Sequence, residues 1–247
     1  MKSSLRFRLL AAVIPVIGLL ASPATASSAT GITHGPFRGT SNRTSSNWSG
    51  YAAHGGTDSF TSVSASWVQP VGTCTAEATY SAFWVGLDGY TSKTVEQTGS
   101  EVDCDGGSPV YYAWYEMYPA FPHNFSNTVL PGDHFTASVT ASGDTFTLQI
   151  ADKTQDWSHT ITKSLSGTKK SSAEVIAEAP CCQANGDILP LTDFGAVQFK
   201  HSEANGSPVG SSTPTKINMR PISGGSNTDQ TSSLSNGEKF SVTWEGN

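Results

Sequence analysis

Hydrophobic and polar residues alternate in short runs along most of the chain, and turns rich in Gly, Asp, Ser and Pro separate these runs. Alternation of this kind is typical of half-buried β-strands. We predict strands at residues 59–68, 79–88, 94–102, 110–118, 134–141, 145–151, 158–165, 173–178, 196–201 and 239–244, with one further short strand at 215–219. No segment has a helical hydrophobic stripe of useful length. The pattern therefore predicts an all-β chain folded as an antiparallel sandwich or barrel.

The first 26 residues have the three-part pattern of a secretory signal peptide. Lys2, Arg6 and Arg8 precede an apolar run at residues 9–20, and the small residues at 24–26 form a cleavage site. The apolar run is too short to cross a bilayer comfortably. We therefore expect cleavage at the end of that site, a secreted, extracellular mature chain, and no association of that chain with a membrane.

The mature chain is expected to form one domain. Its length of about 220 residues is within the range of a single all-β domain, and the sequence contains no internal repeat. We assign residues 46–247 to this domain and interpret the polar residues 27–45 as a flexible N-terminal arm or a short pro-segment. Residues 203–237, rich in Ser, Gly, Asn and Thr, are expected to form long loops. Nothing in the sequence indicates obligate assembly, so we expect a monomer.

The mature chain is acidic and poor in charge. Removal of Lys2, Arg6 and Arg8 from the 14 basic residues leaves 11 against 20 acidic ones, a net charge of −9. Nucleic acid is therefore excluded as a partner. Charged residues make up 14% of the chain, against about a quarter in an average globular protein. Such a surface loses few ion pairs in acid and is compatible with low pH, although many neutral secreted β-proteins share it.

Four cysteines in an exported chain are expected to form disulfides, and four allow three connectivities. If the predicted strands on either side of residues 89–93 form a hairpin, Cys74 and Cys104 continue its ladder and are placed to pair. Cys181 and Cys182 remain, adjacent in the sequence. A vicinal disulfide, two free thiols and a crossed pairing with the other two cysteines all stay open.

Common hydrolase signatures are absent from the sequence. It contains no G-x-S-x-G elbow, no H-E-x-x-H zinc motif, and no Asp-Thr-Gly or Asp-Ser-Gly triplet of the kind aspartic peptidases use. The histidines at positions 34, 54, 123, 134, 159 and 201 are scattered among predicted loops and strand ends, and we expect them to be surface residues. Neither cysteines nor histidines form a zinc pattern, so no metal or cofactor is expected. A Ser/His/Asp triad, whose members need only meet in space, stays open.

Carboxylates, amides and aromatic rings share faces of four predicted strands. Because side chains alternate along a strand, each of the following sets points one way: Trp84, Gly86 and Asp88; Val95, Gln97, Gly99 and Glu101; Tyr112, Trp114, Glu116 and Tyr118; Glu174, Ile176 and Glu178. Together they would present rings and polar groups on one concave, exposed sheet face, as in a binding groove. The alternative is an ordinary β-surface, where Trp, Tyr and single Glu residues are common.

The motifs around these residues resemble the glutamic peptidases, the eqolisin family, including its secreted bacterial members. The resemblance runs through SSNWSGY at 45–51, FTSVSASWVQP at 60–70, FWVGLDGY at 83–90, EQTG at 96–99, YYAWYEMYP at 111–119, PGDHFTASV at 131–139, SAEVIAE at 172–178 and LTDFGAVQF at 191–199. The motifs keep one order over most of the mature chain. This chain departs from the family's pattern at two of these points. Glu101 stands where the family often has Asp, and the loop after Asp88 lacks the cysteine of fungal members.

The resemblance implies a sandwich of two long, bent antiparallel sheets, with a concanavalin-like or jelly-roll architecture, and an active site on the concave face. It places the catalytic glutamine at Gln97 and the catalytic glutamate at Glu178. The residues expected to bind substrate or to support this pair are Trp48, Trp84, Asp88, Glu101, Tyr112, Trp114, Glu116 and Glu174. The implied function is that of a secreted, metal-independent acid endopeptidase acting on polypeptides.

The chemistry of the two residue types agrees with that function. Peptide hydrolysis needs a base that activates water, a donor that stabilises the oxyanion, and an acid that protonates the leaving amine. Glu178 can serve as base and then as acid, and its ordinary pKa is near 4.3, which favours activity in acid. The amide of Gln97 does not titrate and can donate to the oxyanion at any pH.

Two other functions use the same face. A secreted β-sandwich glycoside hydrolase would employ Glu116 and Glu178 as its pair of carboxylates, about 5 Å apart for retention of configuration and further for inversion. A carbohydrate-binding or lectin-like module would stack sugar rings on Trp84, Tyr112 and Trp114 without turnover. Substrate tests separate these possibilities from the peptidase.

Overall fold

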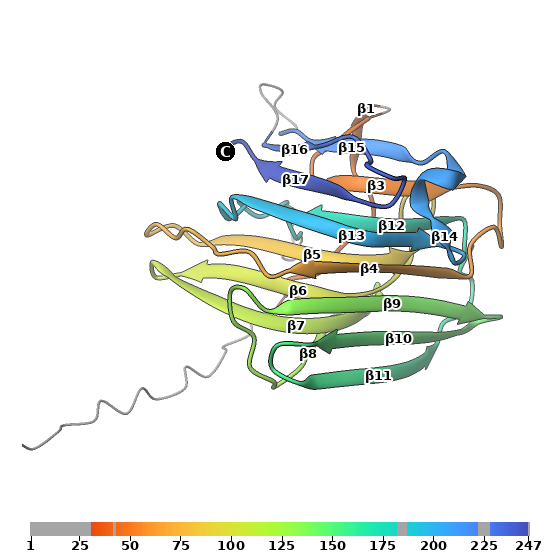
Figure 1. Cartoon of the computed structure of the whole chain (residues 1–247), viewed down its shortest axis with the longest axis horizontal. Coiled ribbons are helices and arrows are strands. Elements are labelled where there is room, and N and C mark those ends of the chain that lie inside the picture. The colour runs from red at the N-terminus through yellow and green to blue at the C-terminus, as the bar shows by residue number, and fades with distance from the viewer. Residues whose placement is uncertain (1–30, 42, 182–186, 222–227, 247) are drawn as a thin grey trace, which may run out of the picture.

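The computed structural model describes residues 31–41, 43–181, 187–221 and 228–246 (Figure 1). The predicted signal peptide, residues 1–26, lies outside these ranges. The strands are β1 Gly39–Ser41, β2 Thr44–Ser45, β3 Trp48–His54, β4 Ser62–Val68, β5 Thr79–Leu87, β6 Val95–Asp105, β7 Ser108–Tyr118, β8 His123–Asn124, β9 His134–Ser142, β10 Thr145–Asp152, β11 Trp157–Ser164, β12 Ser172–Glu178, β13 Ala196–Ala204, β14 Ser207–Pro208, β15 Thr215–Met219, β16 Asp229–Thr231 and β17 Phe240–Trp244, with a short 3-10 helix, η1, at Val209–Ser212. The predicted all-β class is confirmed.

Strand pairing links the chain into one curled sheet. Its main series runs β8, β7, β6, β5, β12, β3, β15, β16, β17, β13, β4, β9, β10 and β11, and each neighbouring pair is antiparallel. The series turns back on itself at β15, so the strands from β3 to β7 lie over those from β17 to β10 (Figure 1). The antiparallel, curled arrangement is thus established, and the finer description as a sandwich of two separate sheets stays a prediction.

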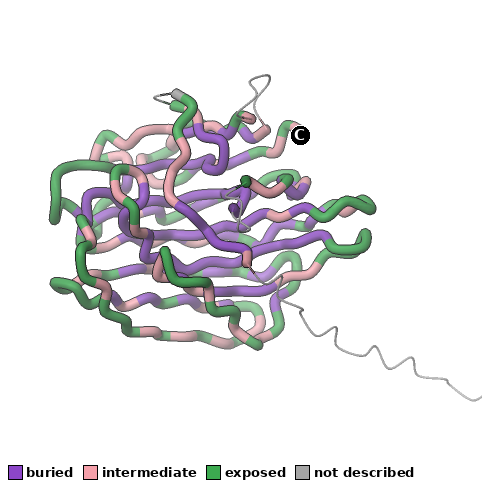
Figure 2. The backbone as a smooth tube through the Cα atoms, turned by 180° about the vertical axis from the view of Figure 1, so that it is seen from behind, coloured by how far each residue is buried: buried purple, intermediate pink, exposed green. Residues whose placement is uncertain are grey.

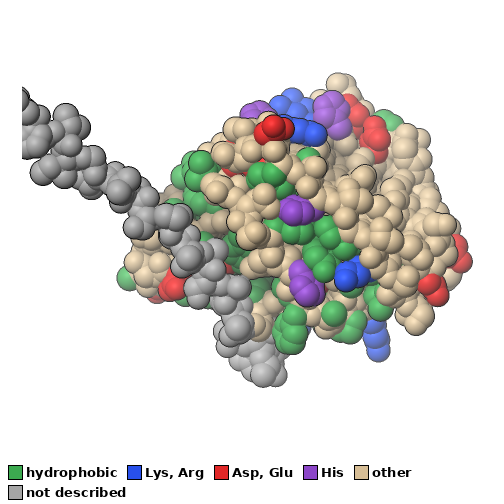
Figure 3. All heavy atoms as spheres, turned by 90° about the horizontal axis from the view of Figure 1, so that it is seen from below, with side chains coloured by type: hydrophobic (Ala, Val, Ile, Leu, Met, Phe, Trp, Pro, Cys, Tyr) green, Lys and Arg blue, Asp and Glu red, His purple; other side chains and the backbone are tan. Residues whose placement is uncertain are grey.

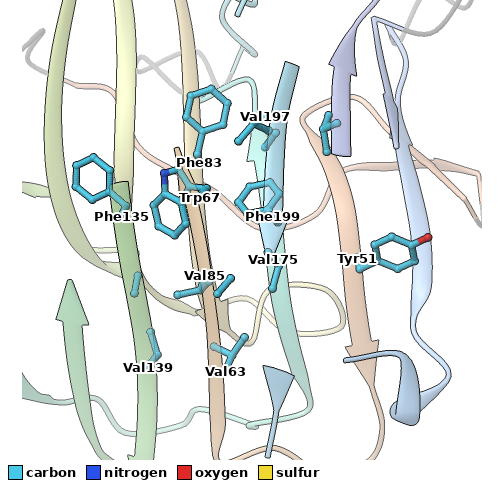
Figure 4. Close-up of a cluster of buried hydrophobic side chains, with 14 of the residues drawn as sticks. Tyr51, Val63, Trp67, Phe83, Val85, Phe135, Val139, Val175, Val197 and Phe199 are labelled. Atoms are coloured by element: carbon cyan, nitrogen blue, oxygen red, sulfur yellow. The ribbon is translucent and has the colours of Figure 1, made fainter. Parts of the chain in front are cut away.

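The main hydrophobic core lies where the sheet folds over itself. Phe83 and Val85 of β5 and Val175 of β12 contribute to it from one side, and Trp67 and Phe135 contribute from the other (Figure 4). All five side chains are buried. Figure 2 shows that the central strands are buried along most of their length, while exposed residues concentrate in the connecting loops. Packing of this kind holds the central strands rigidly, and the other side of these strands carries the residues of the candidate site.

Every predicted run contains a strand, but the sequence pattern missed β3. Its burial is continuous from Trp48 to Ala53, because Tyr51 and Ala53 belong to the main core and Trp48 and Ala52 belong to a second cluster on the opposite face. No alternation therefore marks the strand. Gly50 adopts a φ of +138°, and a Cβ there would lie 2.2 Å from the Val175 carbonyl oxygen. The region at 203–237, predicted to consist of loops around one strand, also contains β14, η1 and β16.

The predicted disulfide between Cys74 and Cys104 is present. Cys104 pairs with Thr79 in the β5–β6 hairpin, so the bond ties the segment before β5 to the end of β6. Cys181 is also disulfide-bonded. Whether Cys181 pairs with Cys182 stayed open in the prediction from the sequence, and Cys182 lies outside the described ranges.

The surface agrees with the low charge of the sequence. Seen from the side of β11, uncharged side chains cover most of the surface, and the few charged ones lie mainly along one edge of the view (Figure 3). Within the described ranges, no helix is long and apolar enough to span a membrane.

Substitution Gly50→Ala should destabilise the fold by on the order of 3 kcal/mol, because the new methyl group has no space against the β12 backbone and the φ is unfavourable. Chemical denaturation followed by tryptophan fluorescence measures this change. Gly56→Ala is the matched control, since Gly56 is exposed and its only near atom is the Ser59 hydroxyl at 3.9 Å. Equal stability of the two variants would contradict the close approach at Gly50.

Candidate functional site

The second face of β3, β12, β5, β6 and β7 carries tryptophans and carboxylates. Trp48, Trp84 and Trp114 form a hydrophobic cluster on this face, opposite the main core. Gln97 of β6 pairs with Glu116 of β7, and β12, which carries Glu178, pairs with β5, so the face brings together side chains from strands far apart in sequence. The sequence analysis interpreted the strands of Gln97 and Glu178 as exposed, and this was wrong. Both side chains are fully buried.

The N-terminal segment buries this face. Residues 31–38 cross it, and in Figure 2 this segment runs over the near side of the strands from the end of the grey trace. The backbone of Thr33 exchanges hydrogen bonds of 2.7 and 3.0 Å with that of Cys181. Further along, the Trp48 indole N–H donates to the Gly35 carbonyl at 3.1 Å, and the Phe37 N–H donates to the Gly89 carbonyl at 3.1 Å. The part of the predicted arm that the structure describes is therefore packed into the site.

His34 lies at the centre of this contact. Its ring stacks on that of Trp114 with 3.6 Å between the centroids and 4° between the planes. Its Nε2 lies 2.8 Å from Glu101 Oε2, and its Nδ1 lies 2.9 Å from Glu116 Oε2. The expectation of a surface histidine was wrong here, since His34 is 1% exposed. A single histidine in a polar segment gives no sequence signal for a contact that forms only in the folded chain.

The side chain of Gln97 binds the backbone of His34. Its Nε2 donates to the His34 carbonyl oxygen at 2.5 Å and lies 3.4 Å from Glu116 Oε2. The Gln97 carbonyl oxygen is buried without a partner. The His34 N–H in turn donates to Glu116 Oε2 at 2.9 Å. The side-chain NH2 group of Gln97 therefore binds a peptide carbonyl, while the side-chain oxygen of Gln97 has no hydrogen-bond partner.

Glu178 is positioned by two donors. The Trp84 indole N–H donates to its Oε2 at 2.7 Å, and the Asn47 amide donates to its Oε1 at 3.3 Å. Burial raises the pKa of Glu178 well above its usual range, and the nearby charge of Glu116 raises it further. The sequence analysis did not single out Asn47, although it precedes Trp48 in the SSNWSGY motif. Glu116 thus accepts a hydrogen bond from Gln97 and acts on Glu178 through its charge.

Burial also raises the pKa values of the other carboxyl groups of the cluster. Burial raises the pKa of Glu101 to about 7. It raises that of Glu116 too, while the hydrogen bond from His34 acts in the opposite direction. Tyr112 donates to Asp103 Oδ2 at 2.7 Å, and burial raises the pKa of Asp103 well above its usual range. Asp103, which the sequence analysis also missed, extends the cluster beyond Glu101.

Two predicted supporting residues lie apart from this cluster. Asp88, at a φ of +68°, accepts hydrogen bonds from the N–H groups of Lys169, Lys170 and Ser171 at 2.8, 2.7 and 3.0 Å, and so it anchors a loop. Glu174 is buried at the other end of β12, and burial raises its pKa well above its usual range. Neither has a hydrogen bond to Gln97 or Glu178 among the described contacts.

The arrangement combines an amide donor, a carboxyl group of raised pKa and a bound peptide carbonyl. A donor held at the oxygen of a carbonyl stabilises negative charge that develops there. A carboxyl group whose pKa is raised can give or take a proton near its pKa. Within the described ranges, no group of three or more His, Cys, Asp and Glu side chains is arranged to hold a metal ion. The geometry fits acid–base chemistry at a carbonyl.

Comparison with known proteins gives consistent matches. The model of the Peptidase A4 family matches residues 46–244. Aspergillopepsin-2 of Aspergillus niger is 33% identical over 144 residues, which cover 55% of this chain and 50% of that protein. Scytalidopepsin B of Scytalidium lignicola is 35% identical over 185 residues, 69% of each chain. The crystal structure of scytalido-glutamic peptidase with a transition state analog inhibitor has a TM-score of 0.70 and 25% identity, covering 81% of this chain and 98% of that one. The chain spans half the length of aspergillopepsin-2.

The folded protein should be more stable in mild acid than near pH 8. Burial raises the pKa of Glu101 to about 7 and that of Glu96 to about 8, from the usual 4.5. Between pH 4.5 and 8 the folded state therefore binds more protons than the unfolded chain, and the free energy of unfolding falls as the pH rises. We expect the melting temperature, measured by calorimetry, to fall by on the order of 5 °C over this window.

Two variants check the assignment of this pH dependence. Glu96→Gln cannot ionise and should flatten the upper part of the fall, whereas Glu77→Gln, at an exposed position, should leave the profile unchanged. A melting temperature that stays level or rises from pH 4.5 to 8 in the unsubstituted protein would show that these carboxyl groups do not keep their protons on folding.

Proposed function

Because the chain belongs to the peptidase A4 family, we propose that it is a secreted acid endopeptidase that hydrolyses polypeptides with Gln97 and Glu178 as its catalytic pair. The observation that carries the proposal is the 2.5 Å hydrogen bond from the Gln97 amide to the carbonyl oxygen of His34. A peptide carbonyl of the chain itself thus occupies the position that a substrate carbonyl requires. The donor is already aimed at the oxygen on which negative charge would develop.

The reaction follows from these positions. Ionised Glu178 removes a proton from water, and the resulting hydroxide adds to the carbonyl carbon of the substrate. The Gln97 amide donates to the tetrahedral oxyanion. Glu178, now protonated, gives that proton to the leaving nitrogen as the carbon–nitrogen bond breaks. The two products are a carboxylic acid and an amine, and the pair returns to its starting state.

The neighbouring carboxyl groups account for an acidic optimum. The charge of Glu116 raises the pKa of Glu178, as does that of Glu101 to a smaller extent. Protonation of both neighbours in acid removes this repulsion and favours the ionised form of Glu178, which is the base. Departure of the N-terminal segment admits water, and the contribution of burial to the raised pKa then decreases. Activity in acid therefore needs protonated neighbours and an open groove.

The remaining side chains of the face orient the pair and line the groove. Trp84 and Asn47 hold the carboxylate of Glu178 through their hydrogen bonds. Trp48 contacts Trp84 edge to face with 5.0 Å between the centroids, and it donates to the backbone of the bound segment. We propose that the concave face belongs to a sandwich of two bent sheets and that the exported chain acts as a monomer. The mechanism invokes no cofactor.

Replacement of either catalytic residue should abolish proteolysis. We expect Glu178→Gln and Gln97→Ala each to lower kcat/KM on an acid-denatured protein by about 1,000-fold or more between pH 2 and 7. Pepstatin and a chelator are present throughout, to exclude aspartic and metal-dependent peptidases. Glu203→Gln, on β13 outside the cluster, is the matched control and should keep activity.

Circular dichroism verifies that each variant is folded. Full activity in either catalytic variant would contradict the proposed pair. Absence of proteolysis by the folded unsubstituted protein at every pH would contradict the peptidase itself, and release of reducing sugar from polysaccharides, or binding to them without turnover, would then identify a glycoside hydrolase or a lectin-like module.

A further inference from the structure

A second groove lies on the side of the molecule opposite the candidate site. Strands β13, β4, β9, β10 and β11 lie side by side in that order (Figure 1). Val63 of β4 and Phe135 of β9 point into the main core, so their neighbours along each strand point outwards. Two hollows of about 490 and 450 Å³ lie on this outward face, and they share Ser66, Thr136 and Lys153. Together they form one continuous groove, here called the outer groove.

Short hydroxyl and amide side chains form the floor of the outer groove. Gln149 of β10 bridges the strands on either side: its Nε2 donates to Thr160 Oγ1 at 3.4 Å, and its Oε1 accepts from Ser138 Oγ at 3.4 Å. Each hydroxyl group keeps further capacity to donate or accept. Trp67 and Phe135 also line the groove, but both are buried and present no ring for stacking. The floor therefore suits a ligand that is rich in hydroxyl groups.

One end of the outer groove is basic, although the chain as a whole is acidic. Lys153, Lys200 and His134 are exposed there, and none of the described residues that line the groove is Asp or Glu. Within the described ranges, neither lysine forms an ion pair. Unpaired positive charge in a hollow attracts anions.

Carboxylates near the outer groove are placed away from this basic end. Glu203 and Glu238 lie at the other end, where Glu238 is 3.9 Å from His201. Asp152 precedes Lys153 in the sequence, but it is buried, and its Oδ1 accepts hydrogen bonds from two backbone N–H groups. The lysine end is therefore the part of the groove that favours an anionic group.

A ligand of the outer groove has to bind through side chains. Strands β4, β9 and β10 each pair with a strand on both sides, so their backbone groups are already bonded and an extended peptide has no sheet edge to join. A sugar chain offers hydroxyl groups and needs no backbone partner. Lys200 on β13 and Lys153 beside β10 are three strand spacings apart, roughly 15 Å. One sugar ring cannot reach both, so the ligand needs several sugars.

We propose that the outer groove binds an acidic polysaccharide, whose carboxylates pair with Lys153 and Lys200 and whose hydroxyl groups bond to the floor. The outer groove and the candidate site face opposite ways, so binding of the polymer does not cover the candidate site. The inference does not depend on the proposed function, because it uses none of the same residues.

Titration with sodium polygalacturonate tests this binding. The full chain at pH 6 and low salt is titrated with this polymer, with galacturonic acid and with dextran, a neutral polysaccharide. We expect binding to polygalacturonate that weakens as salt is added, and none to dextran. Galacturonic acid should bind far more weakly than the polymer, since a single ring reaches only one lysine.

Two double variants locate the charge that the polymer recognises. Lys153→Gln combined with Lys200→Gln should raise the Kd for polygalacturonate about 10-fold or more, because two charge-assisted hydrogen bonds are lost. Lys93→Gln combined with Lys169→Gln is the matched control, since it removes the same charge at exposed positions outside the groove. The control should leave the Kd nearly unchanged.

A further pair of variants locates the floor. Thr136→Glu places a negative charge where the two hollows meet and should abolish binding. Thr162→Glu, exposed on β11 outside the groove, adds the same charge and should keep it. Circular dichroism verifies that each variant is folded.

Three results would overturn the inference. The first is absence of polygalacturonate binding by the folded chain, and the second is an equal loss of affinity in both lysine pairs. The third is binding of dextran, or of poly-L-glutamate, as tight as that of polygalacturonate, because the groove would then recognise neither charge nor sugar specifically.

Discussion

The imidazole of His34, held between two buried carboxyl groups, is the contact on which the functional face depends. Without the ring, Oε2 of Glu101 and Oε2 of Glu116 would lose this partner, and a buried polar atom left without a hydrogen bond destabilises the fold. The ring supplies the partner for both carboxyl groups, and its face stacks on that of Trp114. Burial of the face, the raised pKa values and the placement of a peptide carbonyl at Gln97 all follow from the segment that carries this ring.

The same strands build the core and the site. Along β5, Phe83 and Val85 point into the main core, while Trp84 points to the opposite face and holds Glu178. Alternation along a strand makes this division automatic, and the close packing of the core limits movement of the functional side chains. The site therefore needs no separate scaffold, because its precision derives from the packing beneath it.

Sequence reasoning reached the parts of this arrangement that depend on local pattern. Alternation identified the face shared by Gln97 and Glu101, and the motif order pointed to Glu178. His34 was beyond its reach, because the contact with Glu116 joins positions 82 residues apart and arises only when the chain folds over the sheet. The loop-anchoring role of Asp88 depends on backbone N–H groups, which a sequence does not display, and β3 is buried on both faces and has no periodicity to detect.

The curled sheet has a consequence for behaviour at high concentration. Open sheet edges are templates for pairing with other chains, and proteins protect them by short length or by charge. Within the described ranges, the main series ends at β8, which has only two residues, and at β11, which carries His159 and Lys163. The ammonium group of Lys163 places a positive charge on this edge, which opposes pairing with a second copy of the chain. Both ends of the series are therefore protected against edge-to-edge association, one by its short length and the other by charge.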